Sequence, residues 1–262
     1  MAGAAAPASA VPFDDRGLTL GDGLFETLLA VDGRLRDADA HLARLAAGCA
    51  ALGLPAPDAA AALALMRDAV AGSAGRRAVR LTLTAGSGGR GLERPASPRL
   101  RMFAAAAPAP PPAGPARLVV STVRRNAGSP AARLKTLAYL DNVLARREAQ
   151  AAGADEALML NGAGEVACAA AANVFWLKAG RLYTPALDCG VLAGVTRAAV
   201  IAEAARRGVP TEQVAAGLEA VRAAEAVFLT SSLVGVRAAA SLDGWPLGSD
   251  PLTALLDAAV GA

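Results

Sequence analysis

The sequence predicts an α+β protein with two domains. Segments with the alternating apolar pattern of strands lie between segments with the 3.6-residue spacing of amphipathic helices. A proline-rich stretch, residues 108–115, interrupts this pattern. Proline restricts its own φ angle and has no N–H to donate to a neighbouring strand, so such a run favours an extended connector. We expect a small N-terminal α/β domain over residues 1–112, which begins with a disordered tail at 1–12, and a larger domain over 113–262.

The N-terminal part predicts two strands and two helices. Residues 24–31 have the composition of a strand, and Asp32-Gly33 is a turn signal. Helical spacing follows over 39–52 and over 59–71. Residues 79–84 alternate between apolar and polar side chains, which predicts a strand with one buried face.

The C-terminal part continues the mixed pattern without an internal repeat, and we expect a site between the two domains. The predicted strands are 118–123, 157–160, 174–177 and 226–230, and the predicted helices are 137–152 and 198–207.

Composition excludes several functions. No apolar run reaches the roughly 20 residues that a membrane helix needs. The net charge is only +3 and aromatic residues make up 3%, so no stacking surface for nucleic acid is expected. Cys49, Cys168 and Cys189 are odd in number and far apart, which favours a reducing cytoplasm over a disulfide framework. With His41 as its single histidine, the chain predicts no metal site.

Lysine is rare in this chain. Only Lys135 and Lys178 stand among its 26 lysine and arginine residues. Arginine cannot lose its proton near neutral pH, whereas a lysine that is desolvated or placed near another cation can become a nucleophilic amine. Lys178 precedes a turn pattern and is expected to be exposed. Lys135 is therefore the candidate to form a Schiff base.

Four motifs occur along the chain in a fixed order. They are DRGLTLGDGLFET at 15–27, HLARL at 41–45, RLKTLAYLDNVLARRE at 133–148, and ANVFW at 172–176 with LAGVTR at 192–197. In this order and spacing they resemble the class IV pyridoxal-phosphate enzymes, which include branched-chain and D-amino-acid aminotransferases and aminodeoxychorismate lyase. The resemblance runs from about residue 14 to residue 244. It implies a class IV aminotransferase-like fold, with a barrel-like sheet in the larger, cofactor-binding domain.

The resemblance also implies roles for individual residues. Lys135 would bind pyridoxal 5'-phosphate covalently and move the substrate α-proton. Arg44 and the segment Gly194, Val195 and Thr196 would bind the cofactor phosphate, since N–H groups at a helix start suit an anion. The remaining cofactor-binding positions are Cys168, Asn173 and Ser232, and the substrate-binding positions are Phe25, Arg90 and Tyr139. Family members are generally homodimers, which we expect here.

Taken alone, several of these residues have plainer interpretations. Arg44 is compatible with a solvated helix face, and Gly194 with an ordinary turn. Phe25 fits a core as well as a substrate pocket. His41 lies three residues before Arg44 on the same helix face and is expected to be structural.

Cys168 stands where the family usually has a glutamate, five residues before Asn173. That glutamate pairs with the pyridine nitrogen and keeps it protonated. A thiol is a weak hydrogen-bonding group with a pKa roughly four units above that of glutamate. We therefore expect a less protonated ring and slower or altered transamination. Glu165, three residues earlier, is not expected to reach the same point.

The loop TAGSGGRG at 84–91 departs from one branch of the family. D-amino-acid enzymes have an arginine at the position of Ala85, which helps to hold the substrate carboxylate. Arg90 is a candidate replacement, or a loop cation without a ligand.

Two reactions compete. An aminotransferase would move an amino group between an amino acid, of branched-chain or D type, and a 2-oxo acid. A lyase would cleave aminodeoxychorismate to p-aminobenzoate and pyruvate. Lyases commonly have histidine and methionine where this chain has Thr136 and Thr196, so the aminotransferase is favoured. A weakly active or non-catalytic cofactor-binding protein is the third alternative.

Overall fold

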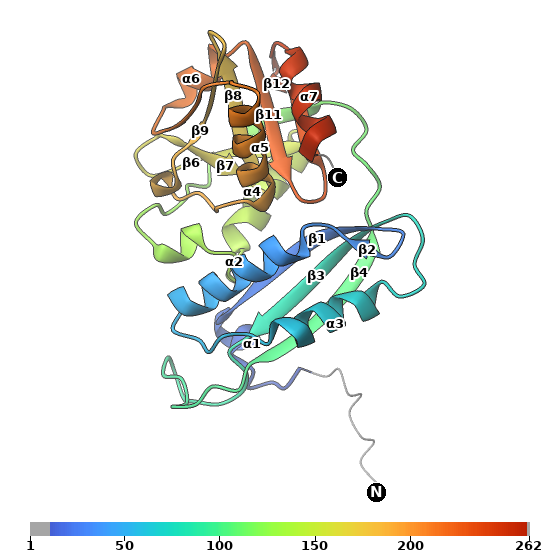
Figure 1. Cartoon of the computed structure of the whole chain (residues 1–262). Helices are drawn as coiled ribbons and strands as arrows, with labels where there is room; N and C mark the ends of the chain where they lie inside the picture. The colour runs from blue at the N-terminus through green and yellow to red at the C-terminus, as the bar shows by residue number, and fades with distance from the viewer. Residues whose placement is uncertain (1–10, 261–262) are drawn as a thin grey trace, which may run out of the picture. The chain divides into compact units, whose positions relative to one another are not determined.

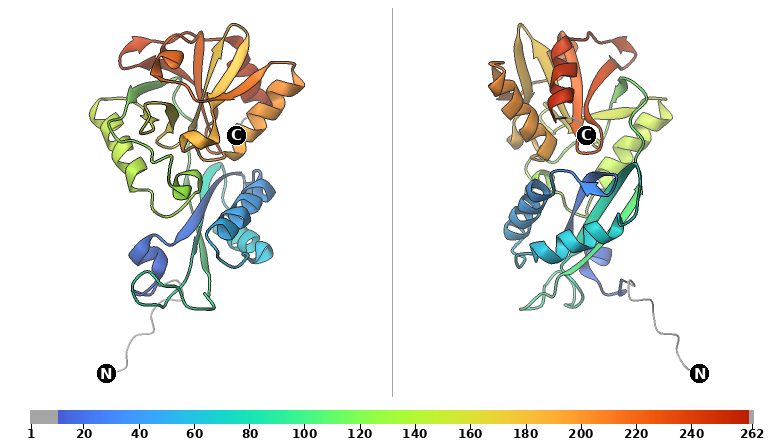
Figure 2. Two further views of the ribbon diagram at one scale, coloured as in Figure 1. Left: turned by 90° about the vertical axis from the view of Figure 1, so that its left-hand side faces the viewer. Right: turned by 45° about the vertical axis from the view of Figure 1, so that its right-hand side comes forward.

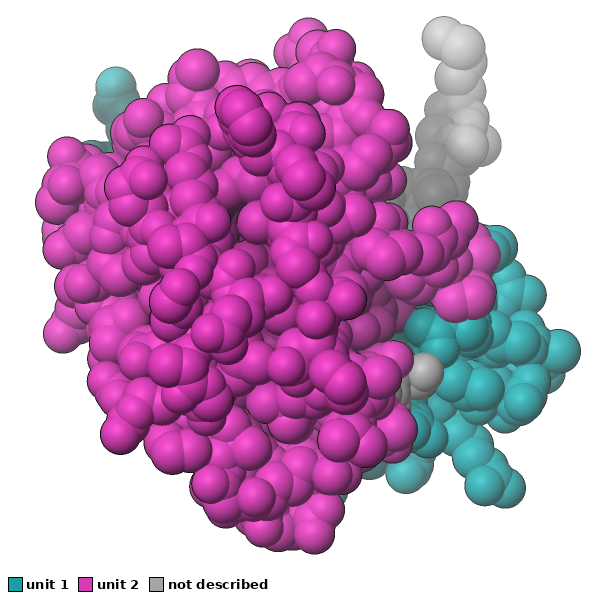
Figure 3. Space-filling view, turned by 90° about the horizontal axis from the view of Figure 1, so that it is seen from above, with its two compact units in different colours: residues 1–109, 135–138 teal, residues 110–134, 139–262 magenta. Residues whose placement is uncertain are grey.

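The computed structural model describes residues 11–260. The chain forms two compact units, coloured separately in Figure 3. One comprises residues up to 109 together with 135–138, and the other comprises 110–134 together with the chain from 139. The division after residue 109 falls close to the expected boundary at 112, but the sequence did not indicate that 135–138 belong to the first unit. The tail expected over 1–12 lies, up to residue 10, outside the described residues.

The first unit is a four-stranded antiparallel sheet with two helices packed on it. The strand order is β2 (Arg34–Leu35), β1 (Gly23–Val31), β3 (Arg76–Thr84) and β4 (Arg101–Pro108). Helix α2 (Ala38–Ala51) packs on β1, and α3 (Ala59–Ala69) packs on β3 and β4 (Figure 1). The short helix α1 (Arg16–Leu20) precedes β1.

The close approach of α2 to β1 depends on Gly48. A Cβ at this position would press on the end of the Leu24 side chain, so the glycine leaves room for Leu24 between the helix and the strand. Leu24 and Leu28 are buried, and Glu26 between them faces the same helix because strand side chains alternate. A carboxylate is thereby placed under α2.

Residues 135–138 extend this sheet at the edge of β1. Thr136 pairs with Leu24 in an antiparallel bridge. The Phe25 N–H donates to the Lys135 carbonyl at 2.9 Å, and the Leu137 N–H donates to the Gly23 carbonyl at 3.0 Å. Lys135 is therefore fixed by backbone pairing to β1 on the edge opposite to β3.

The second unit contains a curled nine-stranded sheet (Figure 2). Its path runs β10 (Thr211–Val214), β9 (Arg181–Pro185), β8 (Asn173–Lys178), β11 (Ala226–Ser231), β12 (Gly235–Leu242), β5 (Ala116–Val120), β6 (Glu156–Leu160) and β7 (Val166–Ala169), with β13 (Trp245–Pro246) pairing β12. The two ends of this path meet: the Val166 N–H donates to the Ala216 carbonyl at 2.8 Å, and Glu165 bridges Gly217. This confirms the expected barrel-like sheet.

Helices and 3₁₀ turns complete the second unit. They are η1 (Pro130–Arg133), α4 (Leu140–Ala151), η2 (Leu187–Cys189), α5 (Val195–Arg206), α6 (Leu218–Arg222) and α7 (Pro251–Val260). One apolar core contains Ala145 and Ala149 of α4 with Met159 of β6. Another contains Phe175 and Phe228, whose stacked rings lie 5.1 Å apart. Among the described residues, no helix is long and apolar enough to cross a membrane.

Each strand and helix expected from the sequence is present, with two corrections. The helix expected from residue 137 begins at Leu140, because 135–138 are extended and pair with β1. The strand expected over 118–123 ends at Val120. The sequence did not predict several elements with weak local signals: α1, α6, α7, β4, β7, β9, β10, β12 and β13.

Candidate active site

Lys135 and Phe25 lie side by side in the first unit. The Lys135 Nζ is 4.3 Å from the centre of the Phe25 ring. The guanidinium carbon of Arg80, on β3, is 3.7 Å from the same ring centre. Phe25 is buried, with 5% of its surface exposed, so its ring lies in the core as well as beside the lysine. Both interpretations of Phe25 from the sequence are therefore compatible with its position.

The surroundings of Lys135 favour its neutral form. Burial lowers the pKa of its amine most, and the charges of Arg44 and Arg80 lower it further, while Glu26 opposes the shift. The result is a pKa of about 8, against an ordinary value of 10.5. A perturbed lysine of this kind is typical of a nucleophilic amine.

Glu26 binds two side chains of α2, His41 and Arg44. Its Oε2 accepts a hydrogen bond from His41 Nδ1 at 2.7 Å. Arg44 binds both oxygens, with Nε to Oε1 at 2.9 Å and Nη2 to Oε2 at 2.5 Å. Burial alone would raise the pKa of Glu26, but these hydrogen bonds outweigh it and lower the pKa. The carboxylate is therefore ionised and orients the guanidinium.

His41 is buried with its ring against Glu26, as expected for a structural histidine. Sequence reasoning assigned no role to Glu26 or Arg80. The strand alternation that placed Phe25 on one face of β1 also places Glu26 on the other, under the helix that carries Arg44. Arg80 follows from the register of β1 and β3, in which Phe25 pairs Thr82. That register is not readable from local sequence.

In the second unit, Asn173 supports the start of α5. Its Nδ2 donates to the Leu192 carbonyl at 3.0 Å, and a Cβ at Gly194 would collide with its side-chain oxygen. Gly194 has an ordinary negative φ, so the glycine is needed for space rather than for backbone conformation. The expected turn glycine is thus a contact between β8 and the first turn of α5.

The first turn of α5 is open to an anion. Gly194 is the N-cap of this 12-residue helix and provides no side-chain hydrogen bond to it. Val195 and Thr196 follow directly, so their N–H groups belong to the unsatisfied first turn. The helix dipole adds partial positive charge at this end. The geometry suits a phosphate.

Cys168 lies in β7, opposite Met159 of β6. Its side chain is buried in the cluster that contains Ala145 and Ala149. Burial raises the pKa of the thiol to about 11; Arg125 opposes the shift and Glu156 adds to it. The thiol is neutral at physiological pH and supplies no negative charge.

Glu165 lies in the turn between β6 and β7, where its Oε2 accepts from Asn161 Nδ2 at 2.7 Å. It is thus engaged away from the strand position of Cys168. Sequence reasoning also missed Arg125, which donates to Asn142 Oδ1 at 3.1 Å and to the Gly190 carbonyl at 3.3 Å. Asn142 in turn donates to the Ala170 carbonyl at 2.8 Å, two residues after Cys168.

Three further predicted residues lie in or beside loops. Ser232 is in the turn between β11 and β12, and Tyr139 is the N-cap of α4. Arg90 is exposed in the loop after β3. Within the first unit, Lys135 therefore lies near two other predicted residues, Phe25 and Arg44. Arg90 lies apart from them.

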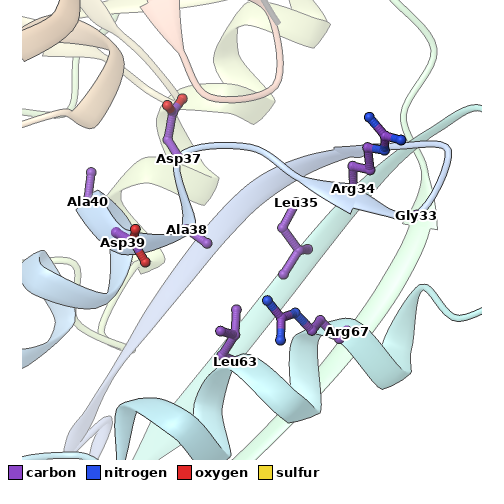
Figure 4. A pocket seen from close by; sticks show the side chains of 9 residues that line it. All are labelled: Gly33, Arg34, Leu35, Asp37, Ala38, Asp39, Ala40, Leu63 and Arg67. Atoms are coloured by element: carbon purple, nitrogen blue, oxygen red, sulfur yellow. The ribbon is translucent and has the colours of Figure 1, made fainter.

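Figure 4 shows an open pocket elsewhere in the first unit. Its lining comes from the β2 hairpin, the start of α2 and one side of α3, and includes Arg34, Asp37, Asp39 and Arg67. Charges of both signs are mixed and exposed here, and none of the residues predicted from the sequence lines the pocket. We therefore place the candidate site at Lys135.

Residues 23–242 match the family profile of the class IV amino-transferases. A fold IV transaminase from Curtobacterium pusillum is 34% identical, with a TM-score of 0.83 over 99% of this chain and 90% of its own. The 4-amino-4-deoxychorismate lyase from Pseudomonas aeruginosa is also 34% identical, with a TM-score of 0.86 over 96% and 94%. A D-alanine aminotransferase from Listeria monocytogenes is 29% identical over 94% of this chain and 88% of its own.

The chain belongs to the class IV aminotransferase family. It is accordingly an enzyme of the pyridoxal-phosphate-dependent group, and pyridoxal 5'-phosphate is its cofactor. The resemblance seen in the four sequence motifs is thereby confirmed, as is the α+β, class IV aminotransferase-like fold. Both transaminases and lyases are among its relatives.

Proposed function

We propose that this protein is an aminotransferase that moves an amino group between an amino acid, of branched-chain or D type, and a 2-oxo acid. The observation that carries the proposal is the amine of Lys135, whose pKa is lowered to about 8 beside Phe25, Arg80 and the Glu26–Arg44 pair. A neutral amine is what a carbonyl-condensing lysine requires.

Each unit has residues that we propose for cofactor binding. In the first unit, Lys135 would provide the amine for the aldehyde, and Arg44 would provide a cation for the phosphate. In the second unit, Gly194, Val195 and Thr196 would provide a helix start for the phosphate, and Ser232 a hydroxyl. Asn173 positions the helix start through Leu192 and Gly194. Pyridoxal phosphate, when bound, supplies an electrophilic aldehyde carbon and a ring that takes up electrons released at the substrate α-carbon.

Lys135 would hold the cofactor through its amine and, once free, would take the substrate α-proton on its own Nζ. A base whose pKa lies near the working pH is suited to both accepting and returning that proton. Phe25 limits the access of water to Nζ. Phe25, Tyr139 and Arg90 are the proposed contacts to the substrate.

The pyridine end of the site differs from the family pattern. We propose that Cys168 would be the residue toward the pyridine nitrogen, where its neutral thiol would give no support to a positive charge. Turnover would then be slower than with a carboxylate at this position.

The lyase is the second candidate. Its support is the 34% identity to the Pseudomonas lyase and the glycine loop at 86–91, whose four glycines all have positive φ. A Cβ at Gly86 would collide with the Arg99 carbonyl, so this loop needs its glycine. Thr136 and Thr196, which replace the histidine and methionine common in lyases, favour the aminotransferase.

An absorption experiment tests these alternatives. We would add D- and L-amino acids one at a time to the cofactor-loaded protein, without an acceptor. Conversion of the yellow, lysine-bound cofactor to the near-ultraviolet pyridoxamine form establishes half-transamination and the preferred hand. A yellow protein that no amino acid bleaches, but that releases pyruvate from aminodeoxychorismate, is the lyase. A protein that stays colourless with cofactor overturns the role of Lys135.

We further propose that the protein is a cytoplasmic homodimer. Leu140 and Val143 on α4 are 67% and 51% exposed, and Leu144 is 39% exposed, which is unusual for neighbouring apolar side chains on one helix. The three cysteines are all unpaired thiols, which suits a reducing compartment. Light scattering of the purified protein would give twice the mass of one chain. Leu140→Lys would reduce the measured mass to that of a single chain.

A further inference from the structure

The Phe25 ring has a cation from each of its neighbours in the sheet. Arg80 reaches it from β3, which pairs with one edge of β1. Lys135 reaches it from the segment that pairs with the other edge. The distances to the ring centre, 3.7 Å and 4.3 Å, lie within the roughly 6 Å at which a cation interacts with an aromatic face.

Two cations beside one ring are not equivalent. The Arg80 guanidinium keeps its proton, because arginine is not deprotonated in proteins at physiological pH. Lys135 is the only one of the two that can relieve the repulsion, and it does so by losing a proton. The ring attracts an ammonium, but it also replaces water that would solvate the charge far better.

The other charges near Lys135 partly cancel. Glu26 attracts a proton to the amine and Arg44 repels it, and these two side chains lie against each other at 2.5 Å. His41 completes this group through Glu26. Arg80 contributes a second positive charge from β3, which pairs with the other edge of β1.

We propose that Arg80, stacked on Phe25, is a positioning residue that keeps the Lys135 amine ready to act as a nucleophile, by holding a permanent positive charge beside it. The Phe25 ring sets the separation of the two groups and withdraws the amine from water. Arg80 thereby acts through Lys135, with no contact to the cofactor required. This deepens the proposed function and depends on it for its chemical meaning, but the protonation of Lys135 is measurable without cofactor.

The two-lysine composition makes a direct measurement possible. The full-length protein is treated with hydroxylamine to release bound aldehyde, and its amines are then dimethylated with ¹³C-formaldehyde and dimethylamine–borane as the reductant. Only Lys135, Lys178 and the N-terminus give NMR signals, and a Lys178→Arg variant assigns them. The ¹³C shift of Lys135 is followed against pH. We expect wild-type Lys135 to titrate near pH 8, as its pKa of about 8 requires.

Two variants remove the Arg80 charge. Arg80→Met keeps an apolar contact with the ring, and Arg80→Gln keeps its polarity. Arg80 contributes less to the lowered pKa of Lys135 than burial or Arg44, so both variants should raise the titration midpoint by a few tenths of a unit, and the unprotonated fraction at pH 7 should fall roughly twofold. Arg80→Lys should keep most of the wild-type behaviour. The matched control is Arg67→Met, which removes an exposed arginine of α3 and should leave the midpoint of Lys135 unchanged.

The inference is overturned if both charge-removing variants fold, as judged by thermal unfolding, and leave the midpoint of Lys135 at its wild-type value. It is also overturned if Arg67→Met shifts the midpoint as much, since the effect would then report net charge. A protein that titrates as expected but never takes up pyridoxal phosphate would instead contradict the proposed function. The two failures are therefore distinct.

Discussion

The amine of Lys135 and the thiol of Cys168 are both withdrawn from water, and burial is the largest cause of the pKa shift in each. It lowers the pKa of Lys135 to about 8 and raises that of Cys168 to about 11. In both cases the shift is toward the neutral form. For a lysine the neutral form is the nucleophile, whereas for a cysteine it is the inert form.

The two regions differ in what surrounds the buried group. Lys135 lies beside Glu26, Arg44 and Arg80, which add fixed charges to the effect of burial. Cys168 lies among alanine side chains and Met159, with Arg125 and Glu156 acting against each other. The first region is arranged for reactivity at a single atom. The second holds a small neutral thiol among apolar side chains.

The largest effect expected is the loss of Lys135. Lys135→Arg keeps the charge but removes the only amine in this cluster that can deprotonate, so amino transfer should fall at least about a thousandfold. The yellow absorption band should disappear as well. Lys178→Arg is the control, because Lys178 is exposed and donates to the Ala223 carbonyl. Equal losses in both variants would contradict the assignment.

Removal of the Glu26 charge should mainly affect stability. Glu26→Gln leaves Arg44 and His41 without the buried carboxylate that binds both, and breaking a buried ion pair costs roughly 3 kcal/mol. Urea unfolding measures this change in the free energy of unfolding. Asp68→Asn, which changes an exposed carboxylate of the same unit, should shift it by less than about 0.5 kcal/mol. A Glu26→Gln protein as stable as wild type would refute the buried pairing.

The reaction of Lys135 with aldehydes should depend steeply on pH. Its pKa of about 8 means that the unprotonated fraction, and hence the rate of cofactor capture, rises roughly fiftyfold from pH 6 to pH 8 and then levels off. Stopped-flow absorbance of the cofactor-free protein mixed with pyridoxal phosphate measures this rate. Acetyl-lysine amide in solution should keep rising above pH 8. A protein profile parallel to that of the free amine would show that Lys135 is unperturbed.

Introducing a carboxylate at position 168 has the smallest expected effect of this series. Cys168→Glu should increase amino transfer about tenfold and shift the cofactor absorption, because a carboxylate supports a protonated ring. Cys168→Ser, which keeps the size and a neutral group, should do neither. Lower activity together with an unchanged spectrum in Cys168→Glu would refute the role given to this position.

The sequence predicted the parts of the fold that have strong local signals. The alternation of β1 and β3, and the helical spacing of α2 and α3, follow from side-chain burial on one face. Strand β4 (Arg101–Pro108) was missed because four of its residues are consecutive alanines, which have low strand propensity. It forms because β3 offers it a partner along its full length.

The site was predicted only residue by residue. Lys135, Arg44 and Gly194 could be found from their motifs. The local sequence after Lys135 favours a helix, yet Thr136 and Leu137 are extended because they pair with Leu24 and Gly23. The approach of Arg80 to Phe25 depends on strand register between segments more than 50 residues apart in the chain. Such long-range pairing cannot be read from composition or periodicity.

The excursion of residues 135–138 into the first sheet makes the two compact units inseparable as fragments. The chain passes from one unit to the other three times. A single cut after residue 109 would therefore separate Lys135 from its backbone partners in β1. Chimaeras between relatives therefore need three junctions, near 109, 134 and 138, if each unit is to come whole from one parent. Residues 135–138 belong to the first unit, but the chain on either side of them belongs to the second, so Lys135 reaches its place in the first sheet only as part of both units.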